Sequence, residues 1–205
     1  SIKTAVVHAM DSFDLAAEAK RSEYVERADY VWFDDALPPG AKPTADNVEG
    51  KAFTFVSEPD GPVLSGKTSV SRVAEGLSQH LFTDATPGLK VGEGDRFFVY
   101  VFLDPINPPK ELMVQFRVAD WKARAFWGDD KIDFGKVGTT ERLRIGDLPI
   151  TGKWVRLEVD AAKLGLTPGT TITGLAFTQF GGAAYWDKTG IETFTPQPGQ
   201  TFDTL

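Results

Sequence analysis

Between Tyr30 and Thr193 the sequence is divided by Gly and Pro into short segments whose apolar residues recur at every second position. A period of two is that of a β-strand with one buried face, whereas an amphipathic helix has a period of 3.6. The glycines and prolines between the segments favour turns and interrupt a regular ladder. Roughly ten such segments predict an all-β domain, an antiparallel β-sandwich or jelly roll.

The expected strands are read from the alternation and from the turn residues that bound it. They cover 30–33, 52–56, 68–73, 76–82, 96–103, 112–118, 121–127, 154–159, 171–180 and 183–187. The proline-rich stretch 37–43 is expected to be a turn, and Gly181-Gly182 a hinge between the last two strands. Residues 161–166 are expected to form one helical turn, and a short strand within 135–147 is left open.

The segments outside this pattern set the domain limits. Residues 12–27 are rich in Ala, Glu, Lys and Arg and follow a capping residue, which predicts a short helix. We therefore divide the chain into an N-terminal helical segment or linker (1–29), a β-sandwich domain (30–193) and a tail (194–205). Because the sequence begins with neither Met nor a secretory leader, we expect it to be part of a larger protein.

Composition excludes several classes of function. The net charge of −7, from 29 acidic and 22 basic residues, opposes binding to nucleic acid. The absence of Cys excludes disulfides, thiolate metal sites and covalently attached haem within this segment. No apolar run approaches the roughly 20 residues that span a bilayer.

The stretch 115–135 carries the candidate ligand-binding residues. It places Trp121, Trp127, Arg124, Gln115 and Arg117 on two short strands and their connection, where indole rings would lie beside hydrogen-bonding groups. A sugar ring packs its C–H face on an indole while polar neighbours bond its hydroxyls. The competing interpretation is that both tryptophans lie in the core, because residues 121, 123, 125 and 127 would share one strand face.

The same stretch contains no pattern that indicates catalysis. No nucleophile has a base beside it, and no carboxylates are marked as the acid and base of a glycosidase. We therefore predict a non-enzymatic, carbohydrate-binding module. The alternative is a structural or protein-interaction domain that positions its neighbours, and a hydrolase would require two convergent carboxylates in a cleft.

Four stretches together resemble a family. They are 30–40, 76–82, 121–135 and 153–191, the last containing Ala-Phe-Thr-Gln-Phe-Gly-Gly and Tyr-Trp-Asp-Lys-Thr-Gly-Ile. They are similar to the β-sandwich region of planctomycete proteins that also carry a planctomycete-type cytochrome c domain. The resemblance covers 30–193 and implies a laminin-G-like or carbohydrate-binding sandwich, other domains in the same polypeptide, and a periplasmic or extracellular location.

A looser resemblance is to carbohydrate-binding modules of families 4 and 22, which hold a structural calcium ion. The equivalents here are the turn 65–67 with Gly66, Asp34 after the first strand, and Asp187 near the end of the last. The sequence departs from that pattern at Lys188, which adds a positive charge beside Asp187. The resemblance implies a Ca²⁺ site formed by Asp34, Gly66 and Asp187.

Overall fold

The computed structural model describes residues 27–46 and 53–199, and nearly all regular structure in these ranges is β. The helix predicted over 12–27 lies, apart from Arg27, outside the described residues. A single 3₁₀ turn, η1 (Ala161–Leu164), confirms the expected helical turn. The strands are β1 (Ala28–Phe33), β2 (Lys42–Asp46), β3 (Thr54–Val56), β4 (Ser69–Thr83), β5 (Leu89–Lys90), β6 (Arg96–Leu103), β7 (Glu111–Arg117), β8 (Ala123–Gly128), β9 (Leu143–Gly146), β10 (Trp154–Asp160), β11 (Thr171–Ile172) and β12 (Gly174–Thr193).

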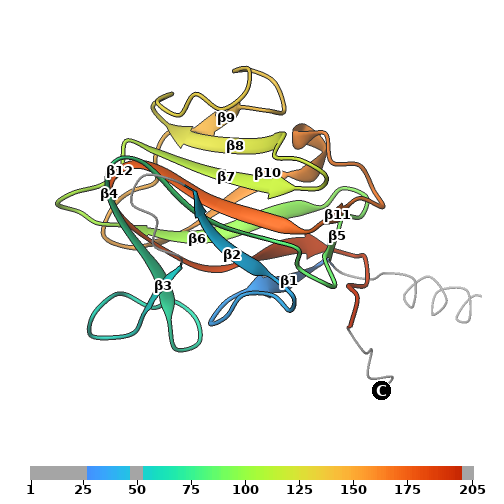
Figure 1. The fold of residues 1–205 in the computed structure, drawn as a ribbon, viewed down its shortest axis with the longest axis horizontal. Coiled ribbons are helices and arrows are strands. Elements are labelled where there is room, and N and C mark those ends of the chain that lie inside the picture. The colour runs from blue at the N-terminus through green and yellow to red at the C-terminus, as the bar shows by residue number, and fades with distance from the viewer. Residues whose placement is uncertain (1–26, 47–52, 200–205) are drawn as a thin grey trace, which may run out of the picture.

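The longest strand, β12, belongs to both layers of the sandwich. Residues 174–180 lie between β4 and β7 in a first sheet ordered β2-β4-β12-β7-β8-β9. Residues 184–192 pair with β6 in a second sheet that also contains β10, β3 and β1. The pairing shifts at Gly181 and Gly182, whose φ angles of 68° and 67° glycine adopts without steric cost. Figure 1 shows β12 crossing the molecule beside β4.

The hydrophobic core lies between the two sheets. Phe97 of β6 stacks on Phe116 of β7 with 4.1 Å between ring centroids, which joins the layers directly. Phe177 and Trp186, on the two halves of β12, stack at 4.9 Å. These pairs meet because alternate residues of both sheets point inward, into the space between the layers.

Some strand predictions are confirmed and others are wrong. The expected β7–β8 antiparallel pair is confirmed, with Gln115 opposite Arg124. The stretch 68–82 is one strand and not two, because β4 keeps its pairing with β12 on both sides of Gly76. The proline-rich stretch was expected to end the ladder, yet β2 includes Pro43. An edge strand tolerates Pro because one of its sides needs no ladder hydrogen bonds.

The outer face of the first sheet is only partly covered. Met113, Phe126 and Ile132 form a second, smaller buried cluster there, separate from the main core. Ile132 belongs to the connection between β8 and β9, which folds over this end of the sheet. The remainder of the face is hollowed, and it carries the candidate site.

Candidate functional site on the outer face of the first sheet

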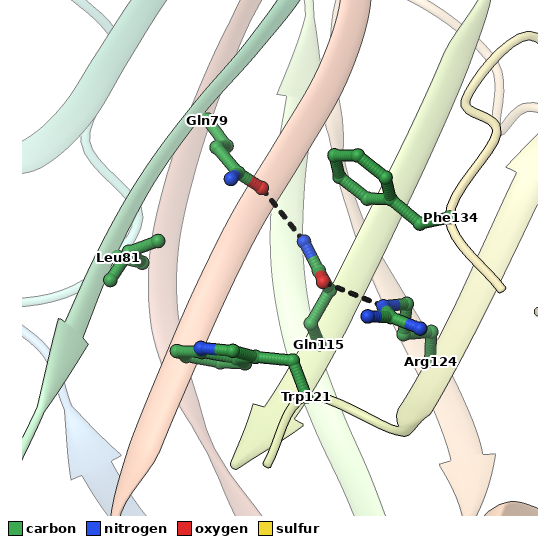
Figure 2. A pocket seen from close by; sticks show the side chains of 6 residues that line it. All are labelled: Gln79, Leu81, Gln115, Trp121, Arg124 and Phe134. Atoms are coloured by element: carbon green, nitrogen blue, oxygen red, sulfur yellow. Dashed lines mark hydrogen bonds between the residues drawn. The ribbon is translucent and has the colours of Figure 1, made fainter. Parts of the chain in front are cut away.

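A pocket of about 170 Å³ lies on this face. Its lining comes from β4, β7, β8 and the two connections that flank β8, and consists of Gln79, Leu81, Gln115, Trp121, Arg124 and Phe134. Figure 2 shows Trp121 and Phe134 on opposite sides of Gln115, with Arg124 beside it. A volume this small, compared with the roughly 300–1,000 Å³ of drug-sized sites, fits one ring of a longer ligand.

A hydrogen-bonded network fixes the polar floor of the pocket. The Nε2 of Gln115 donates to Gln79 Oε1 and to Thr178 Oγ1, both at 2.8 Å. Thr178 Oγ1 donates to the same Gln79 oxygen at 3.1 Å, and Arg124 Nε donates to Gln115 Oε1 at 2.8 Å. Since Gln79, Gln115 and Thr178 are buried, these bonds hold the side chains in single orientations before any ligand arrives.

Two aromatic side chains border the floor, and both are partly exposed. Trp121 precedes β8 and reaches back over β12, where Gly174 leaves room for it. A Cβ on Gly174 would lie 3.3 Å from Trp121 Cη2 and 2.6 Å from the carbonyl oxygen of Phe82. Phe134 comes from the β8–β9 connection and lies 5.7 Å from the Arg124 guanidinium, measured from its ring centroid. The pocket is thus a slot with aromatic sides and an amide floor.

Arg124 is the one charged member of the lining. Its Nη1 donates to the carbonyl oxygen of Glu141 at 3.1 Å, which together with the Gln115 bond fixes the guanidinium plane. Burial lowers the pKa of Arg124 below its ordinary value, while Glu141 and Asp120 act in the opposite direction. The group stays protonated because an arginine pKa lies far above neutrality.

The structure brings together three of the five predicted ligand-binding residues: Trp121, Arg124 and Gln115. Arg117 extends from the same face of β7, two residues from Gln115, beside the lining and not within it. Trp127, the fifth predicted ligand-binding residue, does not line the pocket. It is 5% exposed and packs in the main core, because residues 123, 125 and 127 keep strand alternation with their side chains inward.

Sequence reasoning missed the contributions of other elements to the pocket. Gln79 and Leu81 come from β4, Thr178 from β12 and Phe134 from a loop, all distant in sequence from β7. The alternation within 76–82 did place Gln79 and Leu81 on one face. It could not indicate that β12 would align that face with Gln115.

Of the predicted metal residues, Asp187 lies in the half of β12 that belongs to the second sheet, and Asp34 and Gly66 lie in loops. Asp187 is fully buried, and its Oδ2 accepts the N–H groups of Leu64 and Ser65 at 2.9 and 3.2 Å. Asp34 Oδ2 accepts the Ser65 hydroxyl at 2.9 Å, and Asp34 Oδ1 is buried without a hydrogen-bond partner. Burial raises the pKa of Asp187, and the neighbouring Asp34 carboxyl raises it further, while the N–H groups of Leu64, Ser65 and Lys188 oppose the increase. Two carboxyl groups are therefore held side by side.

Gly66 adjoins a different carboxylate. A Cβ on Gly66 would lie 2.6 Å from Asp35 Cγ, and Asp35 Oδ1 accepts the N–H groups of Lys67 and Thr68 at 2.7 and 2.8 Å. These bonds lower the pKa of Asp35. Within 27–46 and 53–199, no group of three or more His, Asp or Glu side chains is arranged to hold a metal ion. The orphan Asp34 oxygen and the adjacent Asp187 still suit a hard cation in charge and in ligand type.

Comparisons with known proteins show the fold. No protein-family model matches the sequence, and no curated protein matches it. The K1 cleaved adhesin domain of Lys-gingipain from Porphyromonas gingivalis W83 is similar in structure, with a TM-score of 0.51 and 13% identity, over 82% of this chain and 98% of that one. This likeness supports the β-sandwich.

Two further solved structures are similar at lower TM-scores. The CBM22-1 xylan-binding domain of Paenibacillus barcinonensis Xyn10C has a TM-score of 0.43 and 13% identity, over 83% of this chain and 98% of that one. TmCBM61, solved with β-1,4-galactotriose, has a TM-score of 0.44 and 11% identity, over 78% and 97%. Among the described residues, no helix has the length and apolar character that crossing a membrane requires.

Proposed function

We propose that this chain is a non-catalytic module that binds carbohydrate in the pocket on the outer face of the first sheet. The observation that carries the proposal is the slot between Trp121 and Phe134 above a fixed floor of Gln79, Gln115 and Arg124. Aromatic faces pack against the C–H surfaces of sugar rings, and pre-oriented amides bond sugar hydroxyls without losing further side-chain freedom.

The chemistry of the lining supports binding over hydrolysis. None of the six lining residues carries a carboxylate. Glycoside hydrolysis generally uses a pair of carboxyl groups about 5 to 10 Å apart on either side of the scissile bond. The pocket therefore has the groups that hold a sugar and lacks those that would cleave its glycosidic bond.

Titration calorimetry with a panel of neutral and acidic oligosaccharides tests the proposal. We expect Trp121→Ala to weaken binding roughly tenfold or more, because the aromatic face is lost. Trp154→Ala is the matched control, since Trp154 is also partly exposed but lies on β10 and packs against Phe102 at 5.8 Å. Failure of the wild-type protein to bind any member of the panel would reject the function.

The alternative is a domain that positions its neighbours, and one observation favours it. Phe102, Trp154 and Tyr185 form a partly exposed aromatic group on the outer face of the second sheet, with Phe102 5.8 Å from Trp154 and 6.0 Å from Tyr185. Such a group suits a contact with another domain. If Trp154→Ala abolished association with flanking domains while no sugar bound, this function would replace the first.

The wider context is proposed from the sequence resemblance alone. We propose that the module belongs to a larger periplasmic or extracellular protein of the planctomycete cytochrome c type, in which the other domains are its partners. Detection of the native polypeptide in fractionated cells, with an antibody against residues 27–199, tests both its size and its location.

We also propose that Ca²⁺ binds between Asp34 and Asp187. Two observations support this site. Asp34 Oδ1 is buried without a hydrogen-bond partner, and a cation would bind it. The pKa of Asp187 is raised, and a cation would stabilise its charged form. Calcium should then raise the Tm of the wild-type protein, and Asp34→Asn should abolish the increase. An equal Tm in calcium and in EDTA would exclude the site.

A further inference from the structure

Arg124 forms no ion pair with a carboxylate of the described residues, although it lies partly buried in the pocket. Four other arginines form ion pairs with carboxylates at 4.0 Å or less, namely Arg96, Arg142, Arg144 and Arg156. Arg124 bonds only to neutral oxygens, those of Gln115 and of the Glu141 backbone. Within the described chain no carboxylate oxygen lies within 4.0 Å of its guanidinium, and Glu141 and Asp120 act on its pKa only from farther away.

Arg124 has hydrogen-bond donors that no described residue accepts. A guanidinium carries five N–H donors. One donor on Nε and one on Nη1 are used by Gln115 and Glu141, which hold the group in place. No hydrogen bond from Nη2 to another described residue is formed, and Arg124 lines the pocket with Gln115 and Trp121. The remaining donors are thus available to a ligand in the slot.

The pocket lining carries one cation and no carboxylate, although the net charge of the chain is −7. Of the two carboxylates that act on Arg124, Glu141 and Asp120, neither lines the pocket, and Asp120 is paired with Lys122 at 3.3 Å. Arg117 adds a second cation on the same face of β7, without an ion pair to a described carboxylate. Because exposed charges are screened beyond about 8 Å at physiological ionic strength, these near groups outweigh distant acidic ones.

A partly buried cation without a counter-ion is costly, and an anion bound in the slot removes that cost. A carboxylate is planar and accepts two parallel N–H donors from a guanidinium. In a uronic acid, the carboxylate is attached to the same ring that would pack on Trp121. We propose that the pocket recognises an acidic sugar residue, a uronate, with its carboxylate on Arg124 and its ring between Trp121 and Phe134. The inference rests on the proposed carbohydrate-binding function and specifies its ligand class.

Calorimetry with matched ligands tests the inference without altering the protein. Oligogalacturonates and alginate oligosaccharides are each titrated as the free acid and as the carboxyl-reduced, neutral oligosaccharide of the same length. We expect one free acid to bind at least roughly tenfold more tightly than its reduced form, because charge-assisted hydrogen bonds are lost on reduction. We also expect the difference to shrink as the salt concentration rises.

Variants then assign the effect to Arg124. Arg124→Gln should bind the acid and reduced forms equally, whereas Arg124→Lys should keep part of the preference through its charge. Arg144→Gln is the control, since Arg144 is paired with Asp147 at 2.6 Å on the neighbouring strand β9. Thermal melts of each variant establish that it is folded.

Each outcome decides between the inference and the function on which it rests. Equal binding of the acid and reduced forms by the wild-type protein overturns the uronate inference and leaves carbohydrate binding in place. Tighter binding of a sulfated galacto-oligosaccharide than of any uronate also overturns it, in favour of a sulfate ester. No binding of any oligosaccharide rejects the proposed function itself.

Discussion

Glu111 should make the stability of this protein depend on pH. It is fully buried at the start of β7, and its Oε2 accepts the N–H groups of Lys131 and Ile132 at 2.5 and 2.8 Å. Those bonds fasten the connection that carries Phe134 into the pocket. Burial raises the pKa of Glu111 from 4.5 to about 7, and the two N–H bonds only partly oppose the increase.

The sign and size of the effect follow from linkage. The folded protein binds the Glu111 proton more tightly than the unfolded chain does, so the stabilisation is complete below pH 4.5 and is lost as the pH rises to about 7. A pKa difference of one unit corresponds to about 1.36 kcal/mol, so the change from 4.5 to about 7 corresponds to about 3 kcal/mol. Above that pH the contribution of Glu111 is constant.

Urea unfolding of the wild-type protein and of Glu111→Gln at pH 4.5, 6 and 8 measures this contribution. Glutamine is neutral at every pH, so the variant should gain about 3 kcal/mol relative to wild type between the lowest and highest pH. The quantity to compare is the difference in unfolding free energy between the variant and wild type at each pH. His80 changes the stability of both proteins with pH in the opposite direction, and its effect cancels in that difference. Burial, and then Arg72, lower the pKa of His80 well below 6.5, so its contribution is lost as the pH falls.

The exposed Glu93 supplies the control variant, Glu93→Gln. Its unfolding free energy should follow that of wild type across the range. If the difference between Glu111→Gln and wild type stays constant within about 0.5 kcal/mol from pH 4.5 to 8, Glu111 ionises in the fold as an exposed carboxyl does, and the argument from burial is refuted.

Two further predictions concern glycines. Gly182→Ala should destabilise the fold by roughly 1–3 kcal/mol more than Gly181→Ala. Both glycines have positive φ, but only a Cβ at 182 would overlap the backbone of Pro108. Equal urea midpoints of the two variants would contradict this prediction. Gly174→Ala should cost roughly 1–3 kcal/mol, because its Cβ would lie 2.6 Å from the carbonyl oxygen of Phe82, and should weaken sugar binding, because the same Cβ crowds Trp121. Calorimetry on the folded variant checks the second effect, and unchanged affinity would contradict it.

The parts of the fold that the sequence predicts are those determined locally. Alternation with a period of two predicts the strands β7 and β8 and the face that each side chain occupies, and the structure adds the register that places Gln115 opposite Arg124. The same alternation does not predict where the Trp121 side chain points, because Trp121 lies before β8, in a bend where strand alternation no longer determines the direction of a side chain. Strand alternation alone groups it with Trp127, whose side chain the strand does direct into the core.

The rest of the fold and of the pocket depends on pairing between segments that are distant in sequence. Gly76 has the local character of a turn, yet β4 continues through it because β12 pairs with both sides. Gln79 and Phe134 reach the pocket from strands and loops whose alignment with β7 is set by β12 and by the Glu111 bonds to residues 131 and 132. No pattern in the sequence around Gln79 or around Phe134 predicts these contacts.

Among the described strands, β12 comes last in sequence, and both layers depend on it. A chain emerging from the ribosome can form hairpins such as β7–β8 early, but neither layer has its middle strand until residues 174–193 have appeared. The apolar segment 96–103 can pair with β10 earlier, but the edge that pairs with β12 in the finished domain stays uncovered until then. Folding is therefore deferred to the end of synthesis of this domain, and aggregation during translation is the hazard that its topology creates.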